Sequence, residues 1–266
     1  MIATSPRILV FDSGVGGLSI VQEIRTLLPR LGIDYVADSA FFPYGTKEES
    51  ELTQRIVAVI DAAIKQLQPA LIVIGCNSAS TIALDLLRQR FNIPFVGVVP
   101  AIKPAAAAST TKTIGLLATE GTIMRDYTRA LARQFAHDCT LVSHGSSELV
   151  LQAERLLRGL PPDRETIRHE LAQLWSQPNA SAIDAVVLGC THFPLLKPLL
   201  LELAPATVQW VDSGAAIARR VASLLPSLTP AATPATDTAF FTGSYDAALT
   251  AGLQSFGFGS CAILKV

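Results

Sequence analysis

The sequence has no surplus of positive charge and no long apolar run, and each absence excludes a class of partner. Its 266 residues include 21 Lys and Arg against 22 Asp and Glu, a formal net charge of -1. Binding a phosphate backbone depends on a basic surplus, so nucleic-acid binding has no electrostatic support. Crossing a bilayer takes roughly 18 to 20 consecutive apolar residues, and no segment approaches this. We therefore expect neither a nucleic-acid nor a membrane partner.

Cysteines are few, and the first seven residues lack the charged and apolar blocks of a signal peptide. These features predict a soluble, cytoplasmic protein. Half of the residues are hydrophobic and 16% are charged, which excludes a disordered or fibrous class. In a reducing compartment the widely spaced cysteines are expected to be free thiols, so each is open to a reactive role: Cys76, Cys139, Cys190 and Cys261.

Short apolar segments alternate with longer amphipathic ones. The apolar segments predict strands at 8–11, 33–37, 71–74, 95–99, 114–118, 140–142, 185–188, 208–211 and 239–242. The amphipathic segments predict helices at 17–28, 53–67, 79–91, 122–134, 164–175 and between 211 and 225. Strands that are apolar on both faces and alternate with helices indicate a parallel sheet covered on both sides. The Pro-, Ala- and Thr-rich segment 226–238 is expected to be an exposed loop.

The second half of the chain repeats a motif of the first half. An apolar strand, a glycine and then a cysteine occur at Cys76 and again at Cys190, 114 positions later. The strand that ends in Asp12 has a looser counterpart that ends in Thr119. We therefore predict an α/β fold of two similar, pseudo-symmetric units, each with a mostly parallel sheet flanked by helices.

The position of the two cysteines predicts a shared site. Ligands bind at the carboxyl ends of strands in open parallel sheets, so two facing units would put Cys76 and Cys190 on opposite walls of one cleft. A thiol next to a helix N-terminus has its pKa lowered toward neutrality, where it exchanges protons. The alternative for either cysteine is a small buried hydrophobe, although the matched contexts favour function. Cys139 and Cys261 lack this context and are interpreted as structural.

Two equivalent proton carriers on opposite faces of one carbon suit racemisation or epimerisation. One thiolate removes the α-proton while the opposite thiol supplies a proton, and the roles reverse for the other enantiomer. In the absence of an electron-sink cofactor, fixed donors and a buried, oriented environment must stabilise the carbanion.

Asp12 lies at a predicted strand end, just before a glycine-rich turn. Its charge would repel a phosphate, and Ser19 stands where the dinucleotide motif G-x-G-x-x-G has its third glycine. A dinucleotide site is therefore not favoured. Asp12 is better suited to contact an amino group or to polarise a nearby thiol, and its alternative role is to cap the following helix.

His192 follows Cys190 by two residues and is suited to tune that thiol. A zinc site of Cys76, Cys190 and His192 is a competing interpretation, but the sequence has no C-x-x-C and no second Cys/His pair, so we predict no metal. Hydroxyl and amide side chains at strand ends could together hold a carboxylate, although each is equally suited to cap a helix: Ser13, Asn77, Ser78, Thr119, Thr122 and Thr191.

Motifs over nearly the whole chain resemble those of the glutamate racemase family. They are V-F-D-S-G-V-G-G-L-S (10–19), P-Y-G-T-K (43–47), G-C-N-S-A-S (75–80), G-V-V-P-A (97–101), A-T-E-G-T-I (118–123), G-C-T-H-F-P-L-L (189–196) and V-D-S-G (211–214). The paired cysteine motifs and the D-S-G start are the specific ones. The resemblance implies two pseudo-symmetric domains, expected at 1–100 plus 210–266 and at 101–209, with the active site in the cleft between them.

The resemblance also implies a function and a set of site residues. The function is cofactor-independent racemisation of L-glutamate to D-glutamate for peptidoglycan synthesis, in a homodimer. Cys76 and Cys190 would be the two acid/base residues, assisted by Asp12 and His192. The substrate would be held by Asp12, Ser13, Pro43, Tyr44, Gly45, Asn77, Ser78, Thr119, Thr122 and Thr191.

Two positions depart from the family pattern. Ser78 stands where the family commonly has Thr, which keeps the hydroxyl and loses a methyl group. The segment 139–148 diverges from the family's Cys-Pro segment that leads to a functional Glu, and Glu148 is the candidate for that residue.

Three other functions compete with this interpretation. The nearest is a racemase of the same superfamily that acts on aspartate or a hydantoin, although the P-Y-G and G-C-T-H-F-P segments favour glutamate. The others are a non-catalytic domain that binds an amino acid or nucleotide, and a zinc hydrolase.

Overall fold

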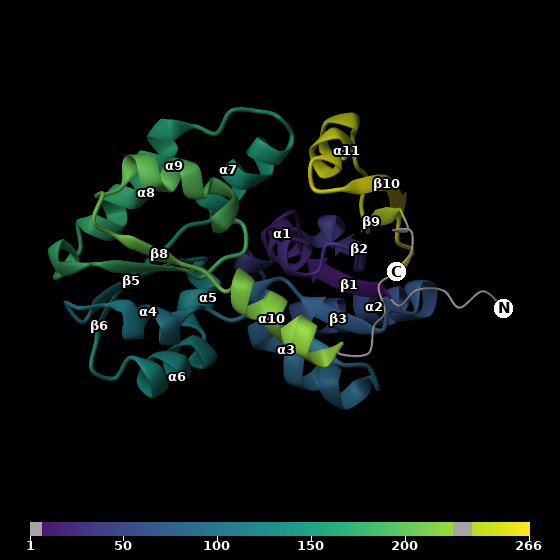
Figure 1. Cartoon of the computed structure of the whole chain (residues 1–266), viewed down its shortest axis with the longest axis horizontal. Helices are drawn as coiled ribbons and strands as arrows, with labels where there is room; N and C mark the ends of the chain where they lie inside the picture. The colour runs from purple at the N-terminus through teal and green to yellow at the C-terminus, as the bar shows by residue number, and fades with distance from the viewer. Residues whose placement is uncertain (1–6, 226–235) are drawn as a thin grey trace.

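The computed structural model describes residues 7–225 and 236–266. Two sheets lie side by side in Figure 1, and their strand orders are β10-β9-β2-β1-β3-β4 and β6-β5-β7-β8. Each pair of neighbouring strands is parallel, so the predicted α/β class with mostly parallel sheets is confirmed. The first sheet contains β1 (Arg7–Asp12), β2 (Gly32–Ala37), β3 (Leu71–Ile74), β4 (Phe95–Gly97), β9 (Asp237–Phe241) and β10 (Phe258–Ile263). The second contains β5 (Thr113–Ala118), β6 (Thr140–Gly145), β7 (Ala185–Leu188) and β8 (Gln209–Val211).

The same strand order occurs in both sheets. The order β2-β1-β3-β4 in the first sheet is repeated as β6-β5-β7-β8 in the second. The connection from β1 runs to β2 on one side, and the connection from β3 runs to β4 on the other side. The same reversal occurs between β5 and β7 in the second sheet. Ligands of open α/β sheets bind at the carboxyl ends of the strands where the connections reverse direction in this way. Cys76 follows β3, and Cys190 follows β7. The two cysteines therefore occupy equivalent places in the two halves.

Helices cover both faces of the first sheet because its strand residues alternate between the faces. Ile8 and Val10 pack with α1 (Leu18–Leu27), α10 (Gly214–Leu224) and α11 (Ala247–Gln254). Leu9 and Phe11 pack with α2 (Glu49–Leu67) and α3 (Asn77–Arg90) on the opposite face. Both clusters consist of fully or almost fully buried side chains, as expected for strands that are apolar on both faces.

The second sheet is covered in the same way. Leu117 and Val186 pack with α7 (Glu148–Leu157), α8 (Arg164–Trp175) and α9 (Lys197–Leu203). Leu116 and Val187 pack on the other face with α4 (Ile102–Ala108) and α6 (Asp126–Phe135). The remaining helical segments are α5 (Glu120–Met124) and four 3-10 turns, η1 (Ser39–Phe41), η2 (Tyr44–Thr46), η3 (Ala180–Ala182) and η4 (Phe193–Leu196). Within the described ranges, no helix has both the length and the apolar character needed to span a membrane.

Several predicted elements differ from the structure. The helix expected at 122–134 is two helices, because Arg125 between α5 and α6 has an extended backbone (φ -71, ψ 141). Of the loop expected at 226–238, residues 226–235 lie outside the described residues, and Asp237 already belongs to β9. The domain boundary expected between 209 and 210 falls inside β8, which pairs with β7. The chain therefore leaves the second sheet after Val211.

The register between the halves also differs from the expected one. Phe11 is the partner of Ile74, and Leu117 is the partner of Leu188. The residue that corresponds to Thr119 is therefore Ser13, and Asp12 corresponds to Ala118. The expected match of Asp12 with Thr119 was wrong by one residue, so the second half has no counterpart of the Asp12 carboxylate.

Candidate active site

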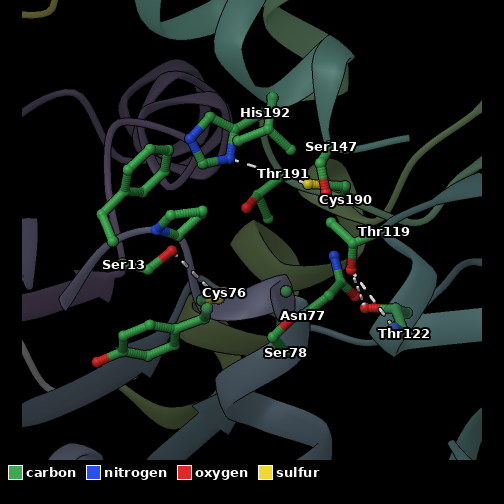
Figure 2. A pocket seen from close by; sticks show the side chains of 15 residues that line it. Ser13, Cys76, Asn77, Ser78, Thr119, Thr122, Ser147, Cys190, Thr191 and His192 are labelled. Atoms are coloured by element: carbon green, nitrogen blue, oxygen red, sulfur yellow. Dashed lines mark hydrogen bonds between the residues drawn. The ribbon is translucent and has the colours of Figure 1, made fainter. Parts of the chain in front are cut away.

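A pocket between the carboxyl ends of the two sheets contains both repeated cysteines. The space in it that no atom fills is about 410 Å³, open solvent included. In Figure 2, Cys76 and Ser13 lie on one wall, and Cys190 and His192 lie on the opposite wall. The complete lining is Ser13, Phe42, Pro43, Tyr44, Gly45, Cys76, Asn77, Ser78, Thr119, Thr122, Ser147, Val150, Cys190, Thr191 and His192. Cys139 and Cys261 lie outside it.

Cys76 is buried at the start of α3. Its sulfur lies 3.8 Å from Ser13 Oγ. Burial, with a further contribution from the negative charge of Asp12, raises the pKa of the Cys76 thiol to about 12. The expectation that the helix N-terminus lowers this pKa toward neutrality is therefore wrong for Cys76, because the loss of hydration outweighs the hydrogen bond from the Ala79 N–H. Cys76 is therefore a protonated thiol at neutral pH.

Cys190 has a different neighbour. Its sulfur lies 3.8 Å from Nδ1 of His192, and both residues are buried. The turn that follows Cys190 is the 3-10 helix η4, which begins only after His192. The predicted pairing of His192 with this thiol is therefore present, whereas the expected helix N-terminus at Cys190 is not.

On the side away from Cys190, His192 contacts the carboxylate of Glu154, which in turn contacts the guanidinium of Arg158. His192 Nε2 lies 3.0 Å from Glu154 Oε1, and Arg158 donates to Glu154 Oε2 at 2.9 Å. Burial lowers the pKa of His192, but the hydrogen bonds with Cys190 and Glu154 outweigh it and hold the pKa well above its usual value. Burial likewise raises the pKa of Glu154, and the contact with His192 reverses the direction, so that the net pKa is lowered. The imidazole beside Cys190 therefore carries a proton at neutral pH.

Asp12 is fully buried behind the pocket and connects the two halves. Its carboxylate accepts hydrogen bonds from the Gly14 N–H at 2.7 Å and from Thr191 Oγ1 at 3.0 Å. Burial raises its pKa, and the positive charge of His192 opposes that effect. The first helix, α1, has Gly17 at its N-cap position without a side-chain cap, so Asp12 does not have the alternative capping role. It holds Thr191 in place and contributes negative charge near Cys76.

The polar side chains predicted to hold a carboxylate line the pocket on both sides. Thr119 caps α5, because its Oγ1 accepts from the Thr122 N–H, and it also lies 3.0 Å from the Thr122 hydroxyl. Capping and pocket lining are thus combined in one residue. Asn77 Oδ1 is buried and has no hydrogen-bond partner among the described residues. A buried acceptor without a donor is costly, so this oxygen is suited to a donor on a ligand.

Pro43, Tyr44 and Gly45 form one wall of the pocket, and Asp38, which was not predicted as a site residue, holds Tyr44 in place. The Tyr44 hydroxyl donates a hydrogen bond to Asp38 Oδ2 at 2.6 Å, so it is not available to donate to a ligand. The Asp38 carboxylate is fully buried and also accepts from Arg55 Nη2 at 2.6 Å and Thr242 Oγ1 at 2.6 Å. Tyr44 therefore borders the pocket through its ring and backbone.

Sequence comparison identifies the family of this chain. The family model described as Asp/Glu/Hydantoin racemase matches residues 8–221. The chain belongs to this racemase family. A curated glutamate racemase from Shewanella woodyi is 52% identical over 221 residues, which cover 83% of this chain and 82% of that protein. A glutamate racemase from Escherichia coli is 49% identical over 220 residues, which cover 83% of this chain and 77% of that protein.

Solved structures of the racemase family have the same fold. The crystal structure of E. coli glutamate racemase in complex with L-glutamate and the activator UDP-MurNAc-Ala has a TM-score of 0.92 and 44% sequence identity, and the match covers 99% of both chains. Glutamate racemase from Thermus thermophilus in complex with β-chloro-D-alanine has a TM-score of 0.77 and 29% identity, covering 98% of this chain and 97% of that one.

One glutamate residue of the site differs from the one predicted from the sequence of this racemase-family chain. Glu148 is exposed at the first position of α7 and does not line the pocket. The carboxylate that contacts His192 is Glu154, on the same helix. Ser147 and Val150 line the pocket, and Glu154 follows Val150 by four residues, on the same helix face. That spacing alone does not single out Glu154 in the sequence, because only the structure shows that Ser147 and Val150 line the pocket.

The zinc interpretation has no geometric support. Within residues 7–225 and 236–266, no three His, Cys, Asp or Glu side chains are close enough together to hold a metal ion. Cys76 and Cys190 lie on opposite walls, and the histidine near Cys190 is already paired with Glu154.

Proposed function

We propose that the chain racemises glutamate by a two-base mechanism in which Cys76 and Cys190 act from opposite faces of the α-carbon. The observation that carries the proposal is the matched position of the two buried cysteines, each directly after the glycine that ends the equivalent strand, on opposite walls of one pocket. Racemisation needs one proton acceptor and one proton donor on opposite sides of the same carbon.

The different surroundings of the two thiols give each a starting role. Cys76 is the protonated donor, since burial raises its pKa to about 12. Cys190, whose sulfur lies 3.8 Å from Nδ1 of His192, is the proton acceptor in this direction. In the first half-reaction the Cα–H bond breaks, its proton bonds to the Cys190 sulfur and the electron pair stays on Cα. The carbanion then takes the Cys76 proton from the opposite face, and Cys76 becomes the thiolate. For the other enantiomer the two thiols exchange roles.

The polar lining suits an amino acid. The unpartnered Asn77 Oδ1 and the nearby Asp12 charge favour the substrate ammonium group. The hydroxyls of Ser13 and Thr119 are suited to donate to a carboxylate, whereas the Thr191 hydroxyl already donates to Asp12. Fixed donors around the reacting carbon stabilise the charge that develops on deprotonation, so the reaction requires no electron-sink cofactor. The similarity to glutamate racemases favours glutamate as the substrate. The proposed enzyme is a cytoplasmic homodimer. Its product, D-glutamate, would enter peptidoglycan synthesis.

Isotope exchange tests this proposal directly. The protein is incubated with L-glutamate in D2O, and α-deuterium incorporation and D-glutamate are measured by mass spectrometry and chiral chromatography. L-aspartate is tested in parallel as the alternative substrate. We expect D-glutamate that carries α-deuterium, and the absence of both from the glutamate reaction refutes the proposal. Cys76→Ser and Cys190→Ser are each expected to abolish racemisation, because a serine hydroxyl is far less acidic than a thiol. Either variant with full activity removes that cysteine from the mechanism.

A further inference from the structure

Arg125 is a partly buried arginine at the break between α5 and α6. Its Nη1 is buried and has no hydrogen-bond partner among the described residues. Arg7 Nη1 is also buried without a partner, but Arg7, Arg55 and Arg158 each pair with a carboxylate at 2.6 to 2.9 Å, and no carboxylate among the described residues pairs with Arg125. A buried cationic N–H group without an acceptor is costly, so this nitrogen is suited to an anionic ligand.

Arg125 lies close to one wall of the pocket without being among the residues that line it. Its Nη2 lies 3.6 Å from where a Cβ on Gly121 would stand, and the Gly45 carbonyl oxygen lies 2.9 Å from the same point. Gly45 lines the pocket. The Arg125 side chain therefore lies where the 43–45 wall meets α5. Its charge interacts with those of Cys76 and Glu49, and no ion pair joins it to either residue.

The net charge of the proposed substrate favours a cation near the pocket. Glutamate carries two carboxylates and one ammonium group, so it enters with a net negative charge. Among the residues that line the pocket, only His192 has a side chain that carries a positive charge, and that charge already faces Glu154. The Asp12 carboxylate adds negative charge nearby. A positive charge outside this set would therefore attract an anionic amino acid to the pocket.

We propose that Arg125 binds a carboxylate of the incoming amino acid beside the 43–45 wall of the pocket and so selects dicarboxylic over neutral amino acids. This inference rests on the proposed function, because it concerns how the same pocket recognises its substrate. Arg125 is a specificity-determining residue, and the proton transfers remain with the two cysteines.

The test compares Arg125→Gln and Arg125→Lys with a matched control, Arg129→Gln. Arg129 is an exposed arginine on α6 that pairs with Asp126 at 2.8 Å. The values of KM and kcat are measured for L-glutamate, and Kd is measured by calorimetry for L-glutamate and for the neutral L-glutamine. We expect Arg125→Gln to raise KM and Kd for glutamate about tenfold, equivalent to about 1.4 kcal/mol. The values of kcat and of Kd for glutamine should change less than about threefold, because the contact is made in ground and transition states alike.

Two further readouts separate recognition from a structural role. Arg125→Lys should restore at least part of the glutamate affinity, and raised ionic strength should narrow the gap between wild type and Arg125→Gln. The unfolding temperature of Arg125→Gln should not fall, since a buried unpaired charge is removed. Unchanged KM and Kd in Arg125→Gln overturn the inference, as does a lower unfolding temperature together with a lower kcat. If wild type does not racemise glutamate, the proposed function fails, while the calorimetric comparison still decides the role of Arg125.

Discussion

Cys76 and Cys190 are matched in position but have unlike neighbours. Cys76 lies near the Asp12 carboxylate and the Ser13 hydroxyl, whereas Cys190 lies beside His192. The register explains the difference, because the position equivalent to Asp12 is Ala118, which has no charge. The two proton transfers therefore take place in different electrostatic surroundings, although the backbone around them repeats.

The Asp12 charge has a measurable consequence for Cys76. A nearby negative charge disfavours the thiolate, so Asp12→Asn should lower the pKa of Cys76 from about 12, while burial keeps it above the usual thiol value. The pH dependence of Cys76 alkylation by iodoacetamide, followed by mass spectrometry in the Cys190→Ser background, measures this shift. Alkylation should begin at lower pH in Asp12→Asn. A profile that stays unchanged or moves to higher pH contradicts the assignment.

The Glu154 contact predicts a second effect on a single residue. Glu154→Gln removes the charge that raises the pKa of His192, so this pKa should fall and kcat/KM should drop about 100-fold, within the usual range for a disturbed acid–base group. Because two enantiomers have equal free energy, kcat/KM must fall equally in both directions. Steady-state rates from L- and D-glutamate measure this. The control is Glu170→Gln, since Glu170 also contacts a histidine, His144, at 2.8 Å, but neither residue lines the pocket. Equal losses in both variants count against a specific role.

At the scale of helices and strands, the sequence predicted the buried elements better than the exposed ones. The strands β3 and β7 are continuous apolar runs, β1 contains one between Arg7 and Asp12, and the structure has all three close to the predicted bounds. The edge strand β10 was not predicted, because most of its residues are exposed or half-buried and include Gly and Ser. Four helices were not predicted either: α4, α7, α9 and α11. Of these, α4 and α9 have seven residues each and α11 has eight. Periodicity thus misses short or peripheral elements, and α7, which has ten residues and buries Leu149, Val150 and Ala153, was missed although it buries a full face.

The pocket shows the same limit. Ser13, Asn77, Thr119 and Thr191 could be predicted because they follow strands whose carboxyl ends meet in parallel sheets. Asp38 and Glu154 act through other side chains and carry no local motif of their own. Their roles depend on contacts between distant segments, such as that of Thr242 with Asp38.

The contacts of Asp38 predict that removal of the Tyr44 hydroxyl destabilises the pocket wall formed by residues 43–45. Tyr44→Phe keeps the ring but removes a donor from the buried Asp38 carboxylate, at a cost of about 1 to 3 kcal/mol in unfolding free energy. We expect KM for glutamate to rise, since the wall loses a fixed position. Urea unfolding and steady-state kinetics measure both effects. The control is Tyr245→Phe, because that exposed tyrosine donates to the Cys261 carbonyl outside the pocket. A Tyr44→Phe variant with wild-type KM would mean that the wall does not depend on this bond.

At the scale of the whole molecule, the two sheets are joined by hydrogen bonds close to the pocket. Ser19 donates to the Thr191 carbonyl at 2.8 Å, and Thr191 donates to Asp12 at 3.0 Å. The Val15 N–H donates to Glu154 at 2.9 Å. The same residues that surround Cys190 thus connect it to the first sheet, so a ligand that contacts both walls contacts both halves of the chain.

This arrangement predicts how glutamate changes the stability of the entire chain. A ligand that binds the folded state stabilises it by about 2.7 kcal/mol at a concentration of 100 times Kd. Because the pocket takes lining residues from both sheets, glutamate should shift one cooperative transition upward rather than stabilise half of the molecule. Calorimetric unfolding with increasing L-glutamate measures this, and glycine, which has no side-chain carboxylate, is the control. Two separate transitions, of which only one moves with glutamate, would place the binding site within a single sheet and its helices.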